Sequence, residues 1–358
     1  MMLPLVSGLA STSLSADERA LFERVQPAGY ILFSRNIASA GQVRALTDEL
    51  RALSRTFDPL ICIDQEGGRV VRTAALGLTT PSAAALGHAG DPVLIAEAAR
   101  MTAATLLFLG ITMNLAPVLD IDSREERANA LPSRCWGGDS QQVINAAGVY
   151  NRAMRQAGMD TCAKHFPGMG RAESDPHHDL PVVRAGKDAF MAQDTVPFMT
   201  LAPELPAMMV AHLLIPDIDP LNPASLSPAV VTDFLRCQLG YNGLVLTDDL
   251  CMGAVSCAST PDKCCVKALL AGCDLPLLCH ETLELLPRAA ERIRKMTYAQ
   301  LADSIRRLEK HLLYMSPPPE PKAGEWESLL ERAAALQDRL PPLHMNTDAV
   351  PSSPVQQY

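Results

Sequence analysis

Residues 160–168 read DTCAKHFPG, an apolar run of strand length that ends in a lysine and a histidine before a Pro-Gly turn. Short apolar runs of this kind alternate along the chain with longer segments of helical periodicity. They lie at residues 3–7, 29–33, 60–64, 112–118, 160–164, 207–212, 244–248 and 273–278. Eight strand–helix units predict a single (β/α)8 TIM-type barrel of the α/β class. A doubly wound open sheet is disfavoured because no GxGxxG motif follows a run.

The segments between the runs predict helices, at 15–25, 40–54, 93–109, 141–156, 228–239 and 282–295. The first opens with Ser15-Ala-Asp-Glu18, the spacing of a capping box. Beyond residue 315 the sequence SPPPEPK ends the preceding helix, 326–340 predicts one more, and the remainder is rich in proline and polar residues. We therefore predict a barrel over 1–315, a C-terminal helix within 316–340 and a disordered tail over 341–358.

The composition narrows the class of partner. With 31 Lys and Arg against 40 Asp and Glu, the formal net charge is −9, and no basic block is present. Neither nucleic acid nor an anionic membrane surface is therefore a predicted partner. Aromatic residues make up only 4% of the chain, which leaves few platforms for stacking long sugar chains or single-stranded bases. We expect a ligand that is small, or one held by polar groups.

Targeting and cysteine signals favour the cytoplasm. No apolar stretch reaches the roughly 18 residues of a transmembrane helix, and no positively charged region precedes the short apolar run at the N-terminus, as a signal peptide requires. Several of the ten cysteines lie inside apolar runs, and no CxxC pair indicates a structural zinc site. The sequence predicts a cytoplasmic protein with free thiols and no metal site.

Polar residues stand where the predicted strands end, which in a barrel is the face that carries the active site. They are Asp64-Gln65-Glu66, Asp120 and Asp122, Lys164-His165, His212, and Asp248-Asp249. A barrel mouth is polar in any case, and that interpretation accounts for any one of these residues taken alone. It accounts less well for Lys164 and His165, because cationic groups at the end of an apolar strand suit the binding of an anion or a hydroxyl.

The loop 168–181, GMGRAESDPHHDLP, is longer and more polar than an ordinary strand-to-helix connection, which is typical of functional loops. Asp175 stands two residues before His177, so its carboxylate can hydrogen-bond the imidazole and raise its basicity, as a general acid/base requires. The alternatives are a solvated polar loop and a metal site built from His177 and His178. The metal site is disfavoured because no HExxH helix supports it.

The segment Thr247-Asp248-Asp249-Leu250 closes another apolar run. A carboxylate at a strand end, close to a second one, can serve as nucleophile or base. Spacing alone does not choose between Asp248 and Asp249, and Asp249 could instead cap the following helix.

Taken together, these segments resemble glycoside hydrolase family 3, in particular its bacterial β-N-acetylhexosaminidases of peptidoglycan recycling. The resemblance covers roughly residues 1–315 and is carried, in order, by GYILFSRNI, ICIDQEGGRVVR, MNLAPVLDID, SRCWGGD, AKHFPGMG, SDPHHDLP, MMVAHLLIPDIDP, ASLSP, GLVLTDDLCMGA and AGCDLPLLC. KHFPG together with TDDLxM is the specific part of the pattern. In the family's glucosidases a tryptophan commonly follows the nucleophilic aspartate, and here a second aspartate does.

The resemblance implies a role for each matching residue. The nucleophile is the first aspartate of TDDLxM, here Asp248, and the acid/base is His177 paired with Asp175. The residues implied to hold the sugar are Asp64, Arg72, Arg134, Lys164 and His165. No metal ion and no organic cofactor is implied.

The implied activity is that of a retaining exo-β-N-acetylglucosaminidase acting through a covalent glycosyl-Asp248 intermediate. Its substrate is a small GlcNAc-containing muropeptide: terminal GlcNAc is removed from GlcNAc-anhydro-MurNAc and its peptides. We expect a cytoplasmic monomer. Two other functions stay open, namely a barrel aldolase that forms a Schiff base on Lys164 and a non-catalytic amino-sugar sensor.

The sensor is motivated by departures from the family's pattern. Met169 stands where KHFPGHG has its second histidine, Pro176 and His178 give DPHHD in place of DSH and an aromatic residue, and Trp136 replaces a phenylalanine. Since the residues with implied catalytic roles are all present, we expect activity to be kept. Because Pro176 stiffens the loop 168–181, the property that these departures call into question is the motion of that loop.

Overall fold

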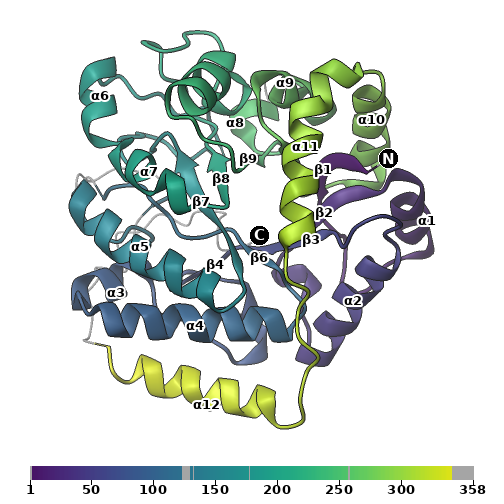
Figure 1. The fold of residues 1–358 in the computed structure, drawn as a ribbon, viewed down its shortest axis with the longest axis vertical. Coiled ribbons are helices and arrows are strands. Elements are labelled where there is room, and N and C mark those ends of the chain that lie inside the picture. The colour runs from purple at the N-terminus through teal and green to yellow at the C-terminus, as the bar shows by residue number, and fades with distance from the viewer. Residues whose placement is uncertain (1, 123–129, 132, 177, 257–258, 341–358) are drawn as a thin grey trace.

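The computed structural model describes residues 2–122, 130–131, 133–176, 178–256 and 259–340. In this part of the chain eight parallel strands close into one barrel, in the order β1-β10-β9-β8-β7-β6-β3-β2, with helices around it (Figure 1). The strands are β1 (Leu3–Ser7), β2 (Pro27–Leu32), β3 (Leu60–Ile63), β6 (Met113–Asn114), β7 (Asp160–Phe166), β8 (Ala207–Val210), β9 (Leu244–Asp249) and β10 (Leu275–Leu278). The predicted single (β/α)8 barrel is confirmed, and each strand overlaps one of the eight predicted runs.

Several strand ends differ from the predicted runs, and three of these strands bear on the site. The run 112–118 forms a regular strand only over β6. Beyond it the chain stays paired with β7, since the N–H of Lys164 donates to the carbonyl of Pro117 at 3.0 Å and Val118 forms an isolated bridge with Lys164. Strand β7 continues to Phe166 and β9 to Asp249. Lys164, His165 and Asp248 therefore lie within strands rather than after them, where backbone hydrogen bonds fix their directions.

A short antiparallel hairpin, β4 (Gln65–Gly67) with β5 (Val70–Val71), follows β3 and was not predicted. Its turn requires glycine, since Gly67 and Gly68 have φ angles of 96° and 61°. A Cβ on Gly67 would also lie 1.9 Å from the carbonyl oxygen of Pro81. The hairpin brings Arg72, directly after β5, to the mouth of the barrel.

The helices alternate with the strands. They are α1 (Ala16–Val25), α2 (Ala40–Ala52), α3 (Ala83–Ala89), α4 (Pro92–Phe108), α5 (Ser140–Gln156), α6 (Lys187–Gln193), α7 (Val196–Leu201), α8 (Gly253–Ser256), α9 (Pro261–Ala271), α10 (Thr282–Arg294), α11 (Tyr298–Tyr314) and α12 (Glu325–Gln337), with a π-helix, η5, at Ala229–Gln238. The predicted capping box is present: the amide of Glu18 donates to Ser15 Oγ (3.1 Å), and the amide of Ser15 donates to Glu18 Oε2 (3.0 Å).

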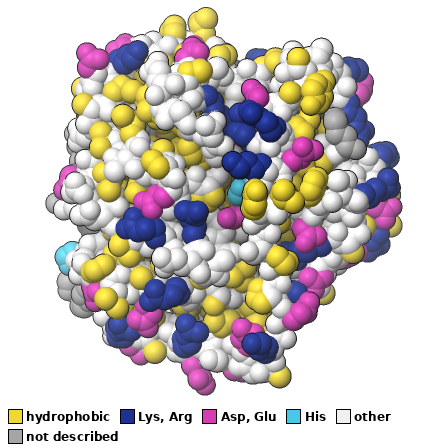
Figure 2. All heavy atoms as spheres, in the orientation of Figure 1, with side chains coloured by type: hydrophobic (Ala, Val, Ile, Leu, Met, Phe, Trp, Pro, Cys, Tyr) yellow, Lys and Arg dark blue, Asp and Glu magenta, His cyan; other side chains and the backbone are white. Residues whose placement is uncertain are grey.

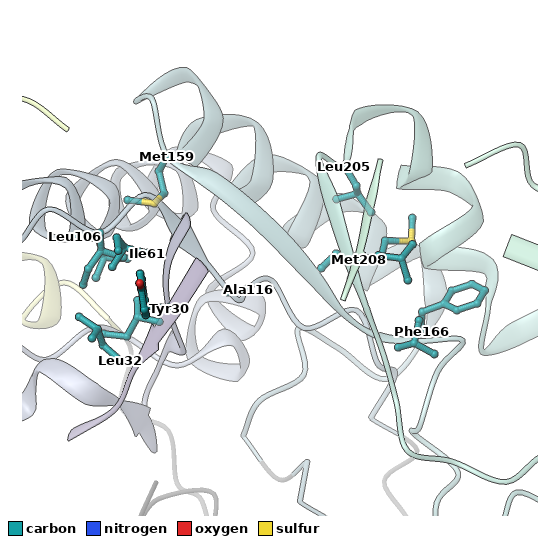
Figure 3. Packing of buried hydrophobic residues seen from close by; sticks show 14 of the residues in the cluster. Tyr30, Leu32, Ile61, Leu106, Ala116, Met159, Phe166, Leu205 and Met208 are labelled. Atoms are coloured by element: carbon teal, nitrogen blue, oxygen red, sulfur yellow. The ribbon is translucent and has the colours of Figure 1, made fainter. Parts of the chain in front are cut away.

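Side chains of the strands alternate between two apolar cores, as the two-residue period of a strand dictates. One row faces the barrel interior and includes Cys62, Cys162 and Leu246. The other row packs against the helices: Tyr30, Leu32 and Ile61 of neighbouring strands lie beside Leu106 of α4 (Figure 3). The position of a residue within its strand therefore decides whether its side chain points into the barrel.

Helix α12 packs along α4 at the outside of the barrel (Figure 1). The ring of Trp326 lies 5.4 Å from that of Phe108, and Leu329 is buried beneath the helix. Arg339, just beyond α12, forms an ion pair of 2.7 Å with Glu97 of α4. The predicted tail, 341–358, lies outside the described residues.

Figure 2 shows one face of the molecule, on which basic and acidic side chains are interspersed with apolar ones. On this face the described residues form no extended patch of a single sign of charge. Among the described helices, none combines the length and the apolar character needed to span a membrane.

Candidate active site

The alternation of the strands brings three predicted site residues into one pocket at the mouth of the barrel. Asp64, Lys164 and Asp248 each stand two residues after a side chain that faces the barrel interior, and all three line the pocket. Arg72, Arg134 and His165, which were also predicted to hold a sugar, line the same pocket. Residues far apart in the sequence thus meet where a barrel enzyme carries its active site.

The space between the lining residues, counted out to the open solvent at the mouth of the pocket, is about 620 Å³. One part of its wall is apolar and includes Phe33, Met209 and Met252. The rest is formed by buried charged groups. Their arrangement decides what the pocket can bind.

A buried network joins Asp64, Glu66, Arg134 and Lys164, and is called the ion-pair network below. Lys164 Nζ lies 2.6 Å from Asp64 Oδ1 and 2.7 Å from Glu66 Oε1. The Glu66 carboxylate also accepts two hydrogen bonds of 2.8 Å, from Nε and Nη2 of Arg134. At the edge of the network, Arg72 Nη2 lies 3.8 Å from Asp64 Oδ2.

Opposite charges outweigh the effect of burial in this network. Burial opposes the charged form of Lys164, but the carboxylates of Asp64 and Glu66 outweigh it and raise the pKa of the ammonium above its usual value. Burial also opposes the charged form of Glu66, but Arg134 and Lys164 hold its pKa well below its usual range. Lys164 is therefore a cationic hydrogen-bond donor rather than a free amine.

His165 is held in one orientation and one tautomer. Its Nδ1 lies 2.6 Å from Asp120 Oδ2, and its Nε2 lies 3.3 Å from Nη2 of Arg134. Because a guanidinium only donates, Nε2 is the acceptor and Nδ1 carries the hydrogen. The second oxygen of Asp120 accepts from the backbone N–H of Met169 at 2.8 Å, which fixes the carboxylate in turn.

The two arginines have different surroundings. Arg134 uses four of its five N–H groups on Glu66, His165 and the carbonyl of Ala130, which leaves one. Arg72 lies over the Phe33 ring, with 5.6 Å between its Cζ and the ring centre. Burial lowers the pKa of Arg72, and Asp64 opposes that effect.

The two aspartates at the end of β9 have different partners. The spacing of the sequence alone did not choose between them as the nucleophile or base. Both aspartates line the pocket, and Oδ1 of Asp248 accepts from the backbone N–H of Asp249 at 2.9 Å. The carboxylate of Asp249 accepts from the backbone N–H groups of Cys251 (3.0 Å) and Cys279 (3.1 Å). Asp249 thus joins the ends of β9 and β10 instead of capping α8, and burial raises its pKa to about 6.

Of the predicted acid/base pair, Asp175 is described, whereas His177 lies outside the described residues. Pro176 lines the pocket, and its carbonyl accepts from the N–H of Ala254, in α8, at 3.2 Å. Burial lowers the pKa of Arg69, in the β4–β5 turn, and the carboxylate of Asp175 opposes that effect. The described part of the loop therefore reaches the pocket on the side of Asp248.

Glu66 and Asp120 complete the site, although the sequence motifs give them no role of their own. The signal for Glu66 is its spacing, since it stands two residues after Asp64. Nothing beyond its place after a predicted strand distinguishes Asp120. Within the described residues, no three His, Cys, Asp or Glu side chains are grouped so that they could hold a metal ion.

Comparisons with known proteins agree with this architecture. The model of the glycosyl hydrolase family 3 N-terminal domain matches residues 3–310. The β-hexosaminidase of Alkalilimnicola ehrlichii is 39% identical over 284 residues, which is 77% of this chain and 80% of that protein. The chain is a TIM-barrel glycoside hydrolase. It belongs to glycosyl hydrolase family 3.

Solved structures extend the comparison. A family 3 β-N-acetylglucosaminidase from Paenibacillus sp. is 32% identical with a TM-score of 0.83, over 93% of this chain and 67% of that one. Native NagZ from Neisseria gonorrhoeae is 26% identical with a TM-score of 0.80, over 94% of this chain and 98% of that one. The NagZ protein has also been solved in complex with N-trifluoroacetyl-D-glucosamine.

Proposed function

We propose that this protein is a retaining exo-β-N-acetylglucosaminidase that removes terminal GlcNAc from peptidoglycan fragments, namely GlcNAc-anhydro-MurNAc and its peptides, in the cytoplasm. The observation that carries the proposal is the position of Asp248, at the end of an inward-facing row of β9 and in a pocket that combines cations and carboxylates with an apolar wall. The names of the β-hexosaminidase relatives and of the N-acetylglucosaminidase structures support the choice of sugar.

In the proposed first step a carboxylate oxygen of Asp248 attacks the anomeric carbon, and the bond to the leaving oxygen breaks. Protonated His177 gives its proton to that oxygen, so the aglycone departs as an alcohol. In the second step water attacks the anomeric carbon, its proton passes to His177, and Asp248 is released. An unperturbed histidine pKa of about 6.5 suits both roles near neutral pH. Asp175 would orient the imidazole.

The sugar itself would be held by the groups that line the pocket. Lys164 has one N–H beyond those directed to Asp64 and Glu66, and Arg134 has one beyond its four internal hydrogen bonds. Asp64 can accept from sugar hydroxyls, and Arg72 can donate to them. Because their partners hold these groups in place before the ligand arrives, little ordering remains to be paid for on binding.

The charge on Lys164 bears on the rival aldolase function. A Schiff-base lysine needs a free amine, which sites of that kind obtain by lowering the lysine pKa. Here the two carboxylates raise the pKa of Lys164. The site therefore favours hydroxyl binding by Lys164 over attack on a carbonyl.

The nucleophile can be tested by trapping. A 5-fluoro N-acetylglucosaminyl fluoride carries a leaving group that needs no acid, so it reports on the nucleophile and not on His177. We expect peptide mass spectrometry to locate the sugar on Asp248 and Asp248→Asn to remain unlabelled. Label on another residue, or no label from an enzyme that turns over substrate, would overturn the mechanism.

The substrate and the acid/base are tested by turnover. Purified protein should hydrolyse a chromogenic GlcNAc glycoside in preference to the matching glucoside, and should release GlcNAc from GlcNAc-anhydro-MurNAc. His177→Ala should lose most activity on an aglycone that needs protonation. It should lose much less of the rate at which the 5-fluoro glycosyl fluoride labels the enzyme, because labelling does not include the second step. A protein that binds GlcNAc but hydrolyses neither glycoside would instead be a sensor.

A further inference from the structure

Two segments of the sequence pattern, MMVAHLLIPDIDP and ASLSP, have no role in the mechanism so far, and they meet beside the nucleophile. His212 follows β8, and Ser225 lies in a short 3-10 helix at Ala224–Leu226. His212 Nδ1 is 2.7 Å from Ser225 Oγ, and His212 Nε2 is 2.9 Å from the backbone carbonyl oxygen of Asp249. Both residues are buried, with 2% and 0% of their surface exposed.

These contacts fix which nitrogen of the His212 ring carries a hydrogen toward Asp249. A carbonyl oxygen only accepts, so the hydrogen bond to Asp249 requires a hydrogen on Nε2. The hydroxyl of Ser225 has both a donor and acceptor lone pairs, and it can satisfy Nδ1 in either protonation state. His212 therefore donates to the backbone of Asp249 with a direction that Ser225 helps to set.

The backbone and side chain of Asp249 are in turn anchored at three points. Its carbonyl accepts from His212, its carboxylate accepts from the N–H groups of Cys251 and Cys279, and its own N–H donates to Asp248 Oδ1 at 2.9 Å. Because the carbonyl and the carboxylate of Asp249 are both held, the direction of its N–H is fixed as well. The N–H then holds one oxygen of Asp248 at the pocket wall.

We propose that His212 and Ser225 are positioning residues that aim the Asp248 carboxylate at the anomeric carbon through the backbone of Asp249. The proposal rests on the proposed function, in which Asp248 is the nucleophile. A misplacement of about 1 Å at a reacting group lowers the rate by about 10²-fold. The effect should fall on the chemical step and leave sugar binding unchanged, because the groups that would hold the sugar lie on β3, β5, β6, β7 and the segments that follow them.

A matched pair of variants separates the two ring nitrogens. Glutamine places its amide nitrogen about where histidine carries Nε2, whereas asparagine places it about where histidine carries Nδ1. His212→Gln keeps a donor for Asp249, and His212→Asn loses it. We expect His212→Asn to lower kcat and the rate of trapping by 5-fluoro N-acetylglucosaminyl fluoride by about 10²-fold, with KM within about twofold of wild type, and His212→Gln to lose less than about tenfold.

Two further variants guard against a merely structural effect. His311→Asn removes a partly buried imidazole that contacts Asp160, the first residue of β7, at the far end of the barrel. It should leave the trapping rate unchanged even if it lowers Tm. Ser225→Ala, which removes only the hydroxyl, should lower kcat severalfold without changing KM, and it serves as the test if His212→Asn does not fold.

The outcomes separate this proposal from the one on which it rests. Wild-type label on a residue other than Asp248 refutes the proposed function itself. Wild-type label on Asp248, with a trapping rate that is unchanged in folded His212→Asn or in Ser225→Ala, refutes the positioning role alone. Equal losses in His212→Gln and His212→Asn also refute it, because the donor to Asp249 would then be irrelevant.

Discussion

Replacement of Glu66 by glutamine tests whether the ion-pair network holds the site together. The side chains of Glu66, Arg134 and Lys164 are each no more than 4% exposed. Glutamine keeps the shape of the side chain, removes its charge and places an amide donor against the donors of Arg134 and Lys164. The substitution therefore leaves Arg134 buried without the carboxylate that its Nε and Nη2 contact.

The expected loss is large. At an effective dielectric constant of about 20, a unit charge pair ~4 Å apart contributes roughly 4 kcal/mol of Coulomb attraction, before the cost of desolvating the ions is subtracted. Measured losses on removing one member of a buried pair are about 3–5 kcal/mol, since the remaining charge is left without compensation. We expect Glu66→Gln to lower the free energy of unfolding by about that amount, a substantial part of the roughly 5–15 kcal/mol of a whole domain.

Urea unfolding near neutral pH measures the change, with Glu204→Gln as the matched control. Glu204 pairs with Arg152 at 2.9 Å, but these side chains are 28% and 49% exposed, so the loss there should be below about 1 kcal/mol. The folded fraction of Glu66→Gln should also bind GlcNAc more weakly, because Lys164 and Arg134 lose their alignment. A loss in Glu66→Gln no greater than that in Glu204→Gln would refute the reasoning.

The pH dependence gives an independent check on the same substitution. The folded pKa of Glu66 lies below its unfolded value of about 4.3, so its stabilisation is fully present above that pH and is lost as pH falls through the folded pKa. The difference between wild type and Glu66→Gln should stay constant from neutral pH down to about pH 5 and narrow only below it. A difference that already shrinks between pH 7 and pH 6 would point to another group.

Two other substitutions probe the strand ends and the C-terminal helix. The folded pKa of Asp249, about 6, lies above the unfolded value, so the stability it contributes is present below pH ~4 and is lost as pH rises through 6. Asp249→Asn should therefore gain about 3 kcal/mol relative to wild type between those pH values in urea unfolding, and a flat difference would contradict the assignment. Leu329→Ala, at a buried contact of α12, should destabilise by about 2–5 kcal/mol, whereas Leu313→Ala, 68% exposed, should change stability by less than about 0.5 kcal/mol; equal effects would show that α12 is not part of the folded core.

The barrel could be predicted from the sequence because each of its strands is an apolar run. The side chains of a run are apolar on both faces, since one face points into the barrel and the other packs against the helices. The position of Asp64, Lys164 and Asp248 at the ends of the predicted strands placed them at the mouth without any knowledge of the loops. The β4–β5 hairpin could not be predicted, because QEGGRVV is short and its pairing depends on two glycines with positive φ. The position of Arg72, which that hairpin sets, came from family resemblance alone.

The contacts that orient the charged groups could not be predicted from the sequence, for a different reason. Asp120, Asp248 and Asp249 are all held by backbone N–H groups, and every residue other than proline has one. No residue type marks such a donor in the sequence. Only the folded chain shows which amides point at a carboxylate.

This also explains why Met169 is compatible with a working site. The family's usual histidine is absent at this position, but the contact that matters to His165 comes from the backbone: the Met169 N–H donates to Asp120, and Asp120 holds the imidazole. The methionine side chain is buried and takes a place in the pocket wall without adding a charge. Trp136 likewise packs in the core, 5.2 Å from the ring of Tyr150. Both departures place an uncharged side chain in the wall or the core, while every charged group that the proposed mechanism takes from the described residues is present.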